Sequence, residues 1–547
     1  MRNQMKLFQQ LLVAPAALGL MAPMAANAAD LDIKGVSDYS ASSEQVTSIS
    51  QFQDVYPTDW AYQALSNLIE RYGCVAGYPS GSYLGNRAMT RFEAAALLNA
   101  CLDRITEVTD ELRRLLNEFE QELAILKGRV DGLEARVGEL EATQFSTTTK
   151  LVGQTSFIVG ANSFAGDAED VFGDDRDDEA AASDGATVFN YDMRLELNTS
   201  FTGKDLLKTR LRAGNFAKSP YSGNGYVGLS ALEVAFPGDE DHNDVVKVDR
   251  LWYQFPLGEE FTVTAGAMVR QDNMLAVWPS NYPSETILDV FTYAGAPGAY
   301  SLTKGGGAGI WWDDNDSGWS ISASYVSGNA DDGNPNTGGV GTDGAASNAT
   351  AQIAYAQDQW GIAAAYSYTS GDNGAGIYPG NATPLAVSLA GSGTTNSYAV
   401  SAWWAPEDTG WFPSISAGWG LNDVNENDDS DLIDNATSQS WYVGVQWEDA
   451  FIEGNVLGAA VGQPTFVTAV DYDSDVDASD FVADGNYAFE LWYKFQVTDN
   501  ISVTPAVYYL SRPLGDLTDG GGPVFGGGRS DDTFSNFGGL VRTTFKF

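Results

Sequence analysis

Charged side chains between residues 194 and 289 form the pattern with the most chemical content in the sequence. Five arginines occur in short alternating segments, where they face away from the neighbouring apolar positions: Arg194, Arg210, Arg212, Arg250 and Arg270. Three acids occur in the segment that follows the last of them: Asp272, Glu285 and Asp289. Opposite charges that face each other across a narrow passage orient and select small polar solutes. The pattern therefore indicates a charged passage, if the flanking elements place these side chains on interior walls.

Composition excludes several other kinds of function. The 547 residues include 29 basic and 73 acidic ones, which gives a formal charge of −44. This balance disfavours a nucleic-acid partner, because phosphate binding needs an excess of Lys and Arg. His242 is the single histidine, which leaves little scope for His-based metal sites or general-base chemistry. No nucleophile motif accompanies it, so we expect no enzymatic activity and no cofactor.

The N-terminus has the features of an export signal. Basic residues at Arg2 and Lys6 precede an apolar stretch, and Ala26-Asn27-Ala28 fits the cleavage pattern of small residues. We therefore expect a signal peptide over residues 1–28 and a linker over residues 29–51. A membrane helix needs about 20 predominantly apolar residues in a row, and no such stretch follows the export signal. The chain is then soluble outside the cytoplasm, or it enters a membrane as a β-barrel.

Residues 150–547 alternate between apolar and polar positions with a period of two, which indicates β-strands. The strand-like stretches are Gln154–Gly160, Phe189–Phe201, Lys208–Gly214, Val246–Phe255, Phe261–Val269, Trp319–Ser327, Thr350–Ala356, Trp360–Thr369, Tyr398–Trp404, Ile415–Leu421, Trp441–Trp447, Ala488–Phe495, Ile501–Leu510 and Gly539–Phe547. Aromatic residues lie at many strand ends, and long loops rich in Gly, Asn and Asp separate the strands. This texture is typical of outer-membrane barrels. We predict a mainly β fold, a transmembrane antiparallel barrel of about 16 strands; a soluble β-sandwich is the alternative.

In a barrel, the five arginine side chains must face either the lipid or the lumen. Charges on the lipid face are costly, so the alternation predicts that they line the lumen on consecutive early strands. Some basic residues near turns, especially Lys204 and Lys208, have an alternative place at the periplasmic rim. The segment Gln271–Ser301 contains three prolines and several aromatics, and we expect it to fold into the lumen. Asp272, Glu285 and Asp289 then face the arginines.

Residues 52–105 read as a small helical module. Its motifs are Phe52-Gln53-Asp54-Val55, Trp60-Ala61, Gly77-Tyr78 and Thr90-Arg91-Phe92-Glu93, the last followed by an apolar helix. In this order they resemble the S-layer homology (SLH) motif, a module that binds cell-wall glycan, often pyruvylated. The resemblance implies glycan-binding roles for Asp54, Trp60, Gly77, Tyr78 and Arg91. Arg91 is the candidate anion-binding group, since a guanidinium suits a carboxylate; Trp60 has an alternative role in the core.

Residues 102–143 carry apolar positions with alternating spacings of three and four, which predicts a coiled coil. Cys74 and Cys101 both fall within residues 52–105; a disulfide between them and a pair of packed thiols both remain open. The acidic runs Asp174–Glu179, Asp428–Asp434 and Asp471–Asp480 fall in predicted outer loops. Asp471, Asp473 and Asp475 form a weak calcium candidate that lacks the later ligands of an EF-hand. Loosely bound divalent cations are the expectation there.

The order of SLH motif, coiled coil and acidic barrel resembles cyanobacterial outer-membrane porins of the carbohydrate-selective OprB-type family, often labelled iron-uptake porins. Further signatures are Ala267–Arg270, Met274–Ser280 and the Gly-rich region around Trp311-Trp312. The resemblance implies a passive channel in the outer membrane, a homotrimer, a periplasmic module on peptidoglycan-linked glycan, and contact with lipid and lipopolysaccharide. Small ions, iron among them, and small sugars are the two solute classes. A structural tether between outer membrane and wall, with little channel activity, is the alternative function.

Overall fold

The alternation of the sequence becomes an alternation of burial in the strands. In β9 (Trp360–Thr369) every second side chain from Trp360 onward is exposed, and the side chains between them are buried. The exposed set includes Trp360, Ile362 and Tyr366, whereas the buried set is small, such as Ala363 and Ser367. A strand of this kind presents an apolar face to lipid and a face of small residues to the interior.

The computed structural model describes residues 148–170, 172–237, 243–282, 286–314, 317–370, 377–407, 410–426, 433–472, 484–519 and 532–547. They belong to one compact unit, Phe145–Phe547. The predicted signal peptide, linker, SLH module and coiled coil, and the two cysteines, lie outside the described residues. Within the described part of the chain, no helix is long and apolar enough to cross a membrane.

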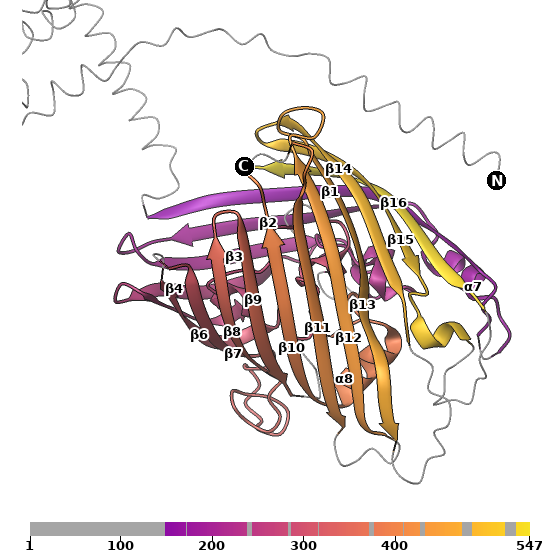
Figure 1. The fold of residues 1–547 in the computed structure, drawn as a ribbon, viewed down its shortest axis with the longest axis horizontal. Helices are drawn as coiled ribbons and strands as arrows, with labels where there is room; N and C mark the ends of the chain where they lie inside the picture. The colour runs from indigo at the N-terminus through magenta and orange to yellow at the C-terminus, as the bar shows by residue number, and fades with distance from the viewer. Residues whose placement is uncertain are drawn as a thin grey trace, which may run out of the picture. The chain divides into compact units, whose positions relative to one another are not determined.

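Sixteen strands in the described residues close into a barrel (Figure 1). They are β1 (Thr149–Gly166), β2 (Val188–Thr199), β3 (Leu206–Gly214), β4 (Lys247–Leu257), β5 (Phe261–Arg270), β6 (Lys304–Asp314), β7 (Trp319–Ser327), β8 (Ser347–Gln357), β9, β10 (Gly393–Trp404), β11 (Ser414–Glu426), β12 (Ile433–Glu448), β13 (Val456–Tyr472), β14 (Tyr487–Thr498), β15 (Ile501–Ser511) and β16 (Phe534–Lys546). Each strand pairs with its neighbours in the sequence, and β1 pairs antiparallel with β16, with Val159 opposite Val541. The predicted fold class is confirmed, and the β-sandwich is excluded because the sheet has no edge.

All fourteen strand stretches expected from the sequence overlap a strand, and the structure adds β6 and β13. Four of the first six residues of β6 are glycine, so there is little side-chain alternation to detect. In β13 the consecutive residues Pro464, Thr465, Phe466 and Val467 are all buried, because a loop packs against this strand from inside. Residue Thr465 accepts a backbone hydrogen bond from Thr383 (2.9 Å) and donates one to Asn381 (3.0 Å).

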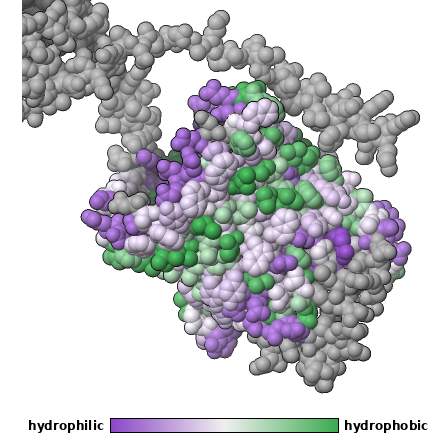
Figure 2. Space-filling view, viewed as in Figure 1, coloured by the Kyte–Doolittle hydropathy of each residue, from purple (hydrophilic) through white to green (hydrophobic). Residues whose placement is uncertain are grey.

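The outer surface of the barrel is apolar over the strands. Figure 2 shows green and pale side chains across the strands, with purple ones gathered towards the ends. Aromatic side chains line one end: Trp319 and Trp360 both pack on Tyr355, at centroid distances of 5.1 and 5.2 Å. An apolar band bordered by aromatic residues matches the hydrocarbon layer and its two interfaces.

The two ends of the barrel differ in their connections. Short turns such as residues 200–205, 258–260 and 358–359 join the strands at one end. Long loops lie at the other end, and the longest are residues 215–246 and 271–303. Outer-membrane barrels place short turns in the periplasm and long loops outside.

Several long loops contain short helices. They are α7 (Arg176–Asp184), η3 (Pro220–Ser222), η4 (Gly228–Ser230), η5 (Gln271–Met274), η7 (Asp289–Thr292), α8 (Pro384–Ser392) and η8 (Gly515–Asp519). The largest buried apolar cluster brings Tyr221 and Leu288 from two of these loops together with Trp492 and Tyr508 from the strands. The interior of the barrel is therefore packed with loop side chains as well as strand side chains.

Candidate functional site: the charged interior of the barrel

The five arginines expected from the sequence lie on four adjacent strands, β2 to β5, and we call them the arginine wall. Arg194 is directly opposite Arg212, Arg210 is opposite Arg250, and Arg270 is opposite Lys304. Like charges in directly opposed positions of a sheet destabilise it. The wall therefore needs counter-charges.

Acidic side chains on the same strands supply them. Asp192 accepts hydrogen bonds from Arg194 Nε (3.1 Å) and Arg212 Nε (2.8 Å). Glu196 pairs with Arg210 Nε (2.7 Å) and with Lys208 Nζ (2.8 Å). Each carboxylate thus bridges two cations. Lys208, for which a rim position was the alternative, belongs to this network.

A β-bulge places one more acid in the wall. The register of β3 with β4 shifts between Arg210 and Leu211, and Asp249 and Arg250 are both buried although they are adjacent. Asp249 pairs with Arg250 Nη1 at 3.0 Å and with Lys304 Nζ at 2.9 Å. Strict alternation from Arg250 would turn Asp249 outward, so the sequence pattern missed it. Asp192, in contrast, shares the two-residue period of Arg194 and Glu196, and that signal was present.

The loop of residues 271–303 lies inside the barrel. Its carbonyl oxygens at Ala294 and Gly295 accept hydrogen bonds from Ser401 of β10 (2.8 Å) and Ser440 of β12 (2.9 Å). Near its start, Gln271 donates to Thr350 of β8 at 2.7 Å. These partners are buried side chains on the inner faces of their strands. The loop therefore follows the inner wall opposite the first strands and narrows the interior.

The three acids expected in this loop have different surroundings. Asp272 pairs with Arg270, with its Oδ1 at 2.6 Å from Arg270 Nε; burial disfavours its charge, but Arg270 holds the pKa of Asp272 below its usual value. Asp289 accepts hydrogen bonds from the hydroxyls of Tyr293 (2.9 Å) and Tyr378. Glu285 lies outside the described residues.

A second loop carries an acid to the arginine wall. Glu233 of the 215–246 loop accepts a hydrogen bond from Arg194 Nη1 at 3.2 Å. Burial alone would raise the pKa of Glu233, but Arg194, Arg542 and Arg212 hold it at about 2. No pattern in the sequence points to Glu233, because its contact with Arg194 depends on how the loop folds.

The 215–246 and 271–303 loops are joined backbone to backbone. The amide of Glu233 donates to the carbonyl of Ile287 (3.0 Å), and the amide of Asp289 donates to the carbonyl of Ala231 (2.9 Å). This pairing places Glu233 and Asp289 beside each other, and Glu233 is one reason why the pKa of Asp289 is raised. Burial is the larger reason, and together they raise the pKa of Asp289 to about 7.

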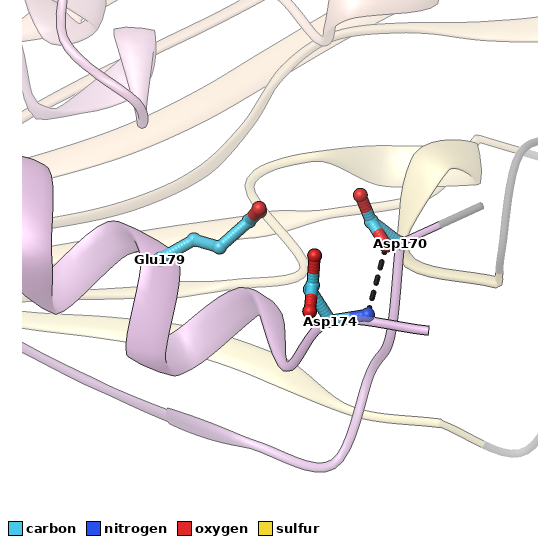
Figure 3. A group of neighbouring side chains, drawn as sticks. All are labelled: Asp170, Asp174 and Glu179. Atoms are coloured by element: carbon cyan, nitrogen blue, oxygen red, sulfur yellow. Dashed lines mark hydrogen bonds between the residues drawn. The ribbon is translucent and has the colours of Figure 1, made fainter. Parts of the chain in front are cut away.

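An acidic cluster lies apart from the wall, in the loop after β1. Asp170, Asp174 and Glu179 place carboxylate oxygens within 4.8 Å of one another (Figure 3). Asp170 accepts backbone hydrogen bonds from Phe172 (2.8 Å) and Asp174 (2.9 Å). Asp174 and Glu179 are the two ends of the first acidic run, Asp174–Glu179, and the structure describes all of that run. Asp471 is exposed at the end of β13, whereas Asp473 and Asp475 lie outside the described residues, as do Asp54, Trp60, Gly77, Tyr78 and Arg91.

A closed sixteen-stranded barrel with an apolar outer band, a charged inner wall and a loop folded inside defines a porin of the outer membrane. Residues 107–547 match the family described as carbohydrate-selective porins of the OprB family. The chain belongs to this family. Residues 51–95 match the S-layer homology domain.

Known proteins resemble the chain over different lengths. A protein of Nostoc sp. with no characterised function is 35% identical and covers 92% of this chain and 86% of its own length. The outer membrane protein SlpA of Thermus thermophilus is 31% identical over 103 residues, which are 16% of this chain and 11% of that protein. The high-pH structure of Pseudomonas putida OprB is 12% identical, with a TM-score of 0.46, and covers 75% of this chain and 96% of its own.

Proposed function

We propose that the barrel is a passive diffusion channel for small solutes in the outer membrane. The observation that carries this proposal is the pair of opposed charged surfaces inside the barrel: the arginine wall on β2 to β5, and the loop acids Glu233 and Asp289. Side chains on both surfaces keep contact with solvent, with exposed fractions of 31% for Arg270 and 30% for Glu233. Opposed charges of this kind orient polar solutes as they pass.

The solutes that we propose are inorganic ions, including iron, and small sugars. The ion pairs of the wall and the acidic outer loops favour small ions, because negative loops concentrate cations at the mouth. The family description, carbohydrate-selective porin, favours sugars. Guanidinium and carboxylate groups also hydrogen-bond to sugar hydroxyls, so the same wall serves either class. The acidic loops would hold divalent cations loosely, between loops or against lipopolysaccharide, and we propose no resident cofactor.

The match of residues 51–95 to the S-layer homology domain supports an anchoring role for the N-terminal part. We propose that this module binds peptidoglycan or a glycan linked to it; the SLH resemblance implies a pyruvylated glycan as one such ligand. Asp54, Trp60, Gly77, Tyr78 and Arg91 are the proposed contacts. A homotrimer would present three such modules together, which accounts for one copy in each chain.

The second candidate function is a structural tether between the outer membrane and the wall. The observation that favours it is the packing of four loops inside the barrel. Leu232 of the 215–246 loop and Leu288 of the 271–303 loop form an isolated backbone bridge, and Ala382 of a third loop forms another with Thr465 of β13. Leu514 of a fourth loop belongs to the same apolar cluster as Leu288. A barrel closed by these loops would anchor the membrane without conducting.

Planar-bilayer recordings of the purified full-length protein separate the two functions. We expect discrete conductance steps in KCl, a reversal potential that reports charge selectivity, and partial block by added sugars if sugars enter. The absence of channel events, with folding verified by the heat-modifiable migration of the barrel on a gel, would leave only the tether.

A further inference from the structure

Glu490 of β14 is a buried carboxylate on the side of the barrel that the arginine wall does not occupy. Its side chain is 3% exposed. Its oxygens accept hydrogen bonds from the Tyr282 hydroxyl (2.7 Å), the Thr286 hydroxyl (2.8 Å) and the backbone amides of Ile287 (3.2 Å) and Leu288 (2.7 Å). All four donors belong to the 271–303 loop. One side chain of the wall therefore holds one short segment of the loop.

Neighbouring side chains strengthen this attachment. Arg542 of β16 donates to the carbonyl oxygen of Thr286 at 3.1 Å. The indole of Trp492 donates to the Tyr282 hydroxyl at 3.0 Å, with its ring 6.2 Å from that of Tyr282. Buried backbone amides that lose their acceptor bear the full penalty of their desolvation. Because Glu490 satisfies two of them at once, residues 286–288 have a strong preference for this place on the wall.

The same segment is next to Asp289 in the chain and pairs with the loop that contains Glu233, and these are the two acids that face the arginine wall. On its other side, Ile287 and Asp289 pair with residues 231–233 of the second loop. Glu233 then reaches Arg194 of β2, and Asp289 follows Leu288 directly. A continuous line of contacts therefore runs from Glu490 on β14, through both loops, to Arg194 on β2.

We propose that Glu490 is the positioning residue that sets the distance of Glu233 and Asp289 from the arginine wall, and thereby the conductance and charge selectivity of the passage. The inference rests on the proposed channel function. Glu490 acts through the loop and not through its own charge, because its carboxylate is enclosed by its donors. Two substitutions separate these roles.

Glu490→Leu removes the acceptor, whereas Glu490→Gln keeps an oxygen for the two amides. The hydroxyl groups of Tyr282 and Thr286 can rotate to accept from the amide nitrogen of Gln. We expect single-channel conductance to change by about twofold in Glu490→Leu, with selectivity shifted towards anions as the loop acids leave the wall. Glu490→Gln should restore the wild-type values. A Gln variant as altered as the Leu variant would mean that the charge matters and would overturn the positioning role.

A matched control separates loop release from general weakening of the barrel. Asn455 is 3% exposed, bonds to Tyr493 (2.9 Å) and to the amide of Gln496 (2.9 Å), and lies at the turn between β12 and β13. Asn455→Leu should lower the thermal stability and leave the channel unchanged. If Glu490→Leu does not fold, the double variant Tyr282→Phe, Thr286→Val removes two donors and keeps the carboxylate, and it should show the same shift in a weaker form.

The outcomes also separate this inference from the channel proposal. A wild-type protein without conductance would end the channel proposal. A conducting wild type together with a folded Glu490→Leu variant of equal conductance and selectivity would end the positioning role alone.

Discussion

Arg194 and Arg212 lie directly opposite each other on β2 and β3, and both bond to the carboxylate of Asp192. The pair shows how the barrel keeps a dense group of guanidinium groups on one wall. The negative charge of the shared acid offsets part of the positive charge of the two arginines, and the fork shape of each guanidinium fixes the orientation of its side chain. The carboxylate is buried, so the partly exposed groups of this cluster are the two arginines.

Asp192→Asn tests the stabilising part of this arrangement. The Asp192 side chain is 2% exposed, and the variant leaves two opposed guanidinium groups without their shared anion. Removing one partner of a buried ion pair costs about 3–5 kcal/mol, so we expect a loss near the lower figure, since the arginines keep some solvent contact. Urea unfolding of the refolded barrel measures it. Asp358→Asn, at an exposed turn, should change the unfolding free energy by less than about 0.5 kcal/mol.

The double variant Arg210→Ala, Arg212→Ala tests the electrostatic part. It removes two positive charges and leaves Glu196 and Asp192 with fewer partners, so the passage should become more selective for cations. The reversal potential across a KCl gradient measures this change. Lys204 lies in an exposed turn, and Lys204→Ala should leave the reversal potential unaltered. Identical potentials in the wild type and the double variant would show that the arginine wall does not line the conducting path.

The SLH part of the chain has a separate prediction, which rests on sequence resemblance. Arg91→Ala should weaken co-sedimentation of the full-length protein with purified cell-wall sacculi by about tenfold, the effect of losing about 1.4 kcal/mol. Arg87 is four residues earlier and outside the Thr90–Glu93 motif, so Arg87→Ala is the control. Equal loss in both variants would point to general charge attraction instead of a specific anion contact.

The sequence predicted much of this architecture because lipid on one side and packed polar groups on the other impose a period of two. That period identified the fold class and placed Arg194, Arg210 and Arg212 on a shared face. It failed where the physical cause of alternation was absent. In β6 the glycines have no side chains that could alternate between lipid and interior. In β13 consecutive residues near Phe466 are buried, so both faces of the strand are covered.

The interior contacts were harder to predict for a different reason. A β-bulge brings Asp249 inward against the local pattern, and a bulge depends on the neighbouring strand. Glu490 and Leu288 are 202 positions apart in the sequence, and Glu233 reaches Arg194 only because two loops pair inside the barrel. Such contacts arise from tertiary folding, and the local period of the sequence carries no information about them.

We expect Asp289 to make the ion selectivity of the proposed passage depend on pH. Burial raises its pKa to about 7, so the side chain is negative above that pH and neutral below it. Lowering the pH from about 8 to about 6 should therefore remove one negative charge beside the arginine wall and reduce cation selectivity, with a midpoint near 7. Among the groups that face it, Glu233 has a pKa of about 2 and stays charged throughout. Asp289→Asn should give a reversal potential that is flat over this range.

Asp484 also has a pKa raised by burial to about 7, but it bonds to Thr383 and to the amide of Asp516 (2.6 Å), so Asp484→Asn should keep the titration. If the titration persists in Asp289→Asn and disappears in Asp484→Asn, the group that titrates is Asp484 and the prediction for Asp289 is wrong.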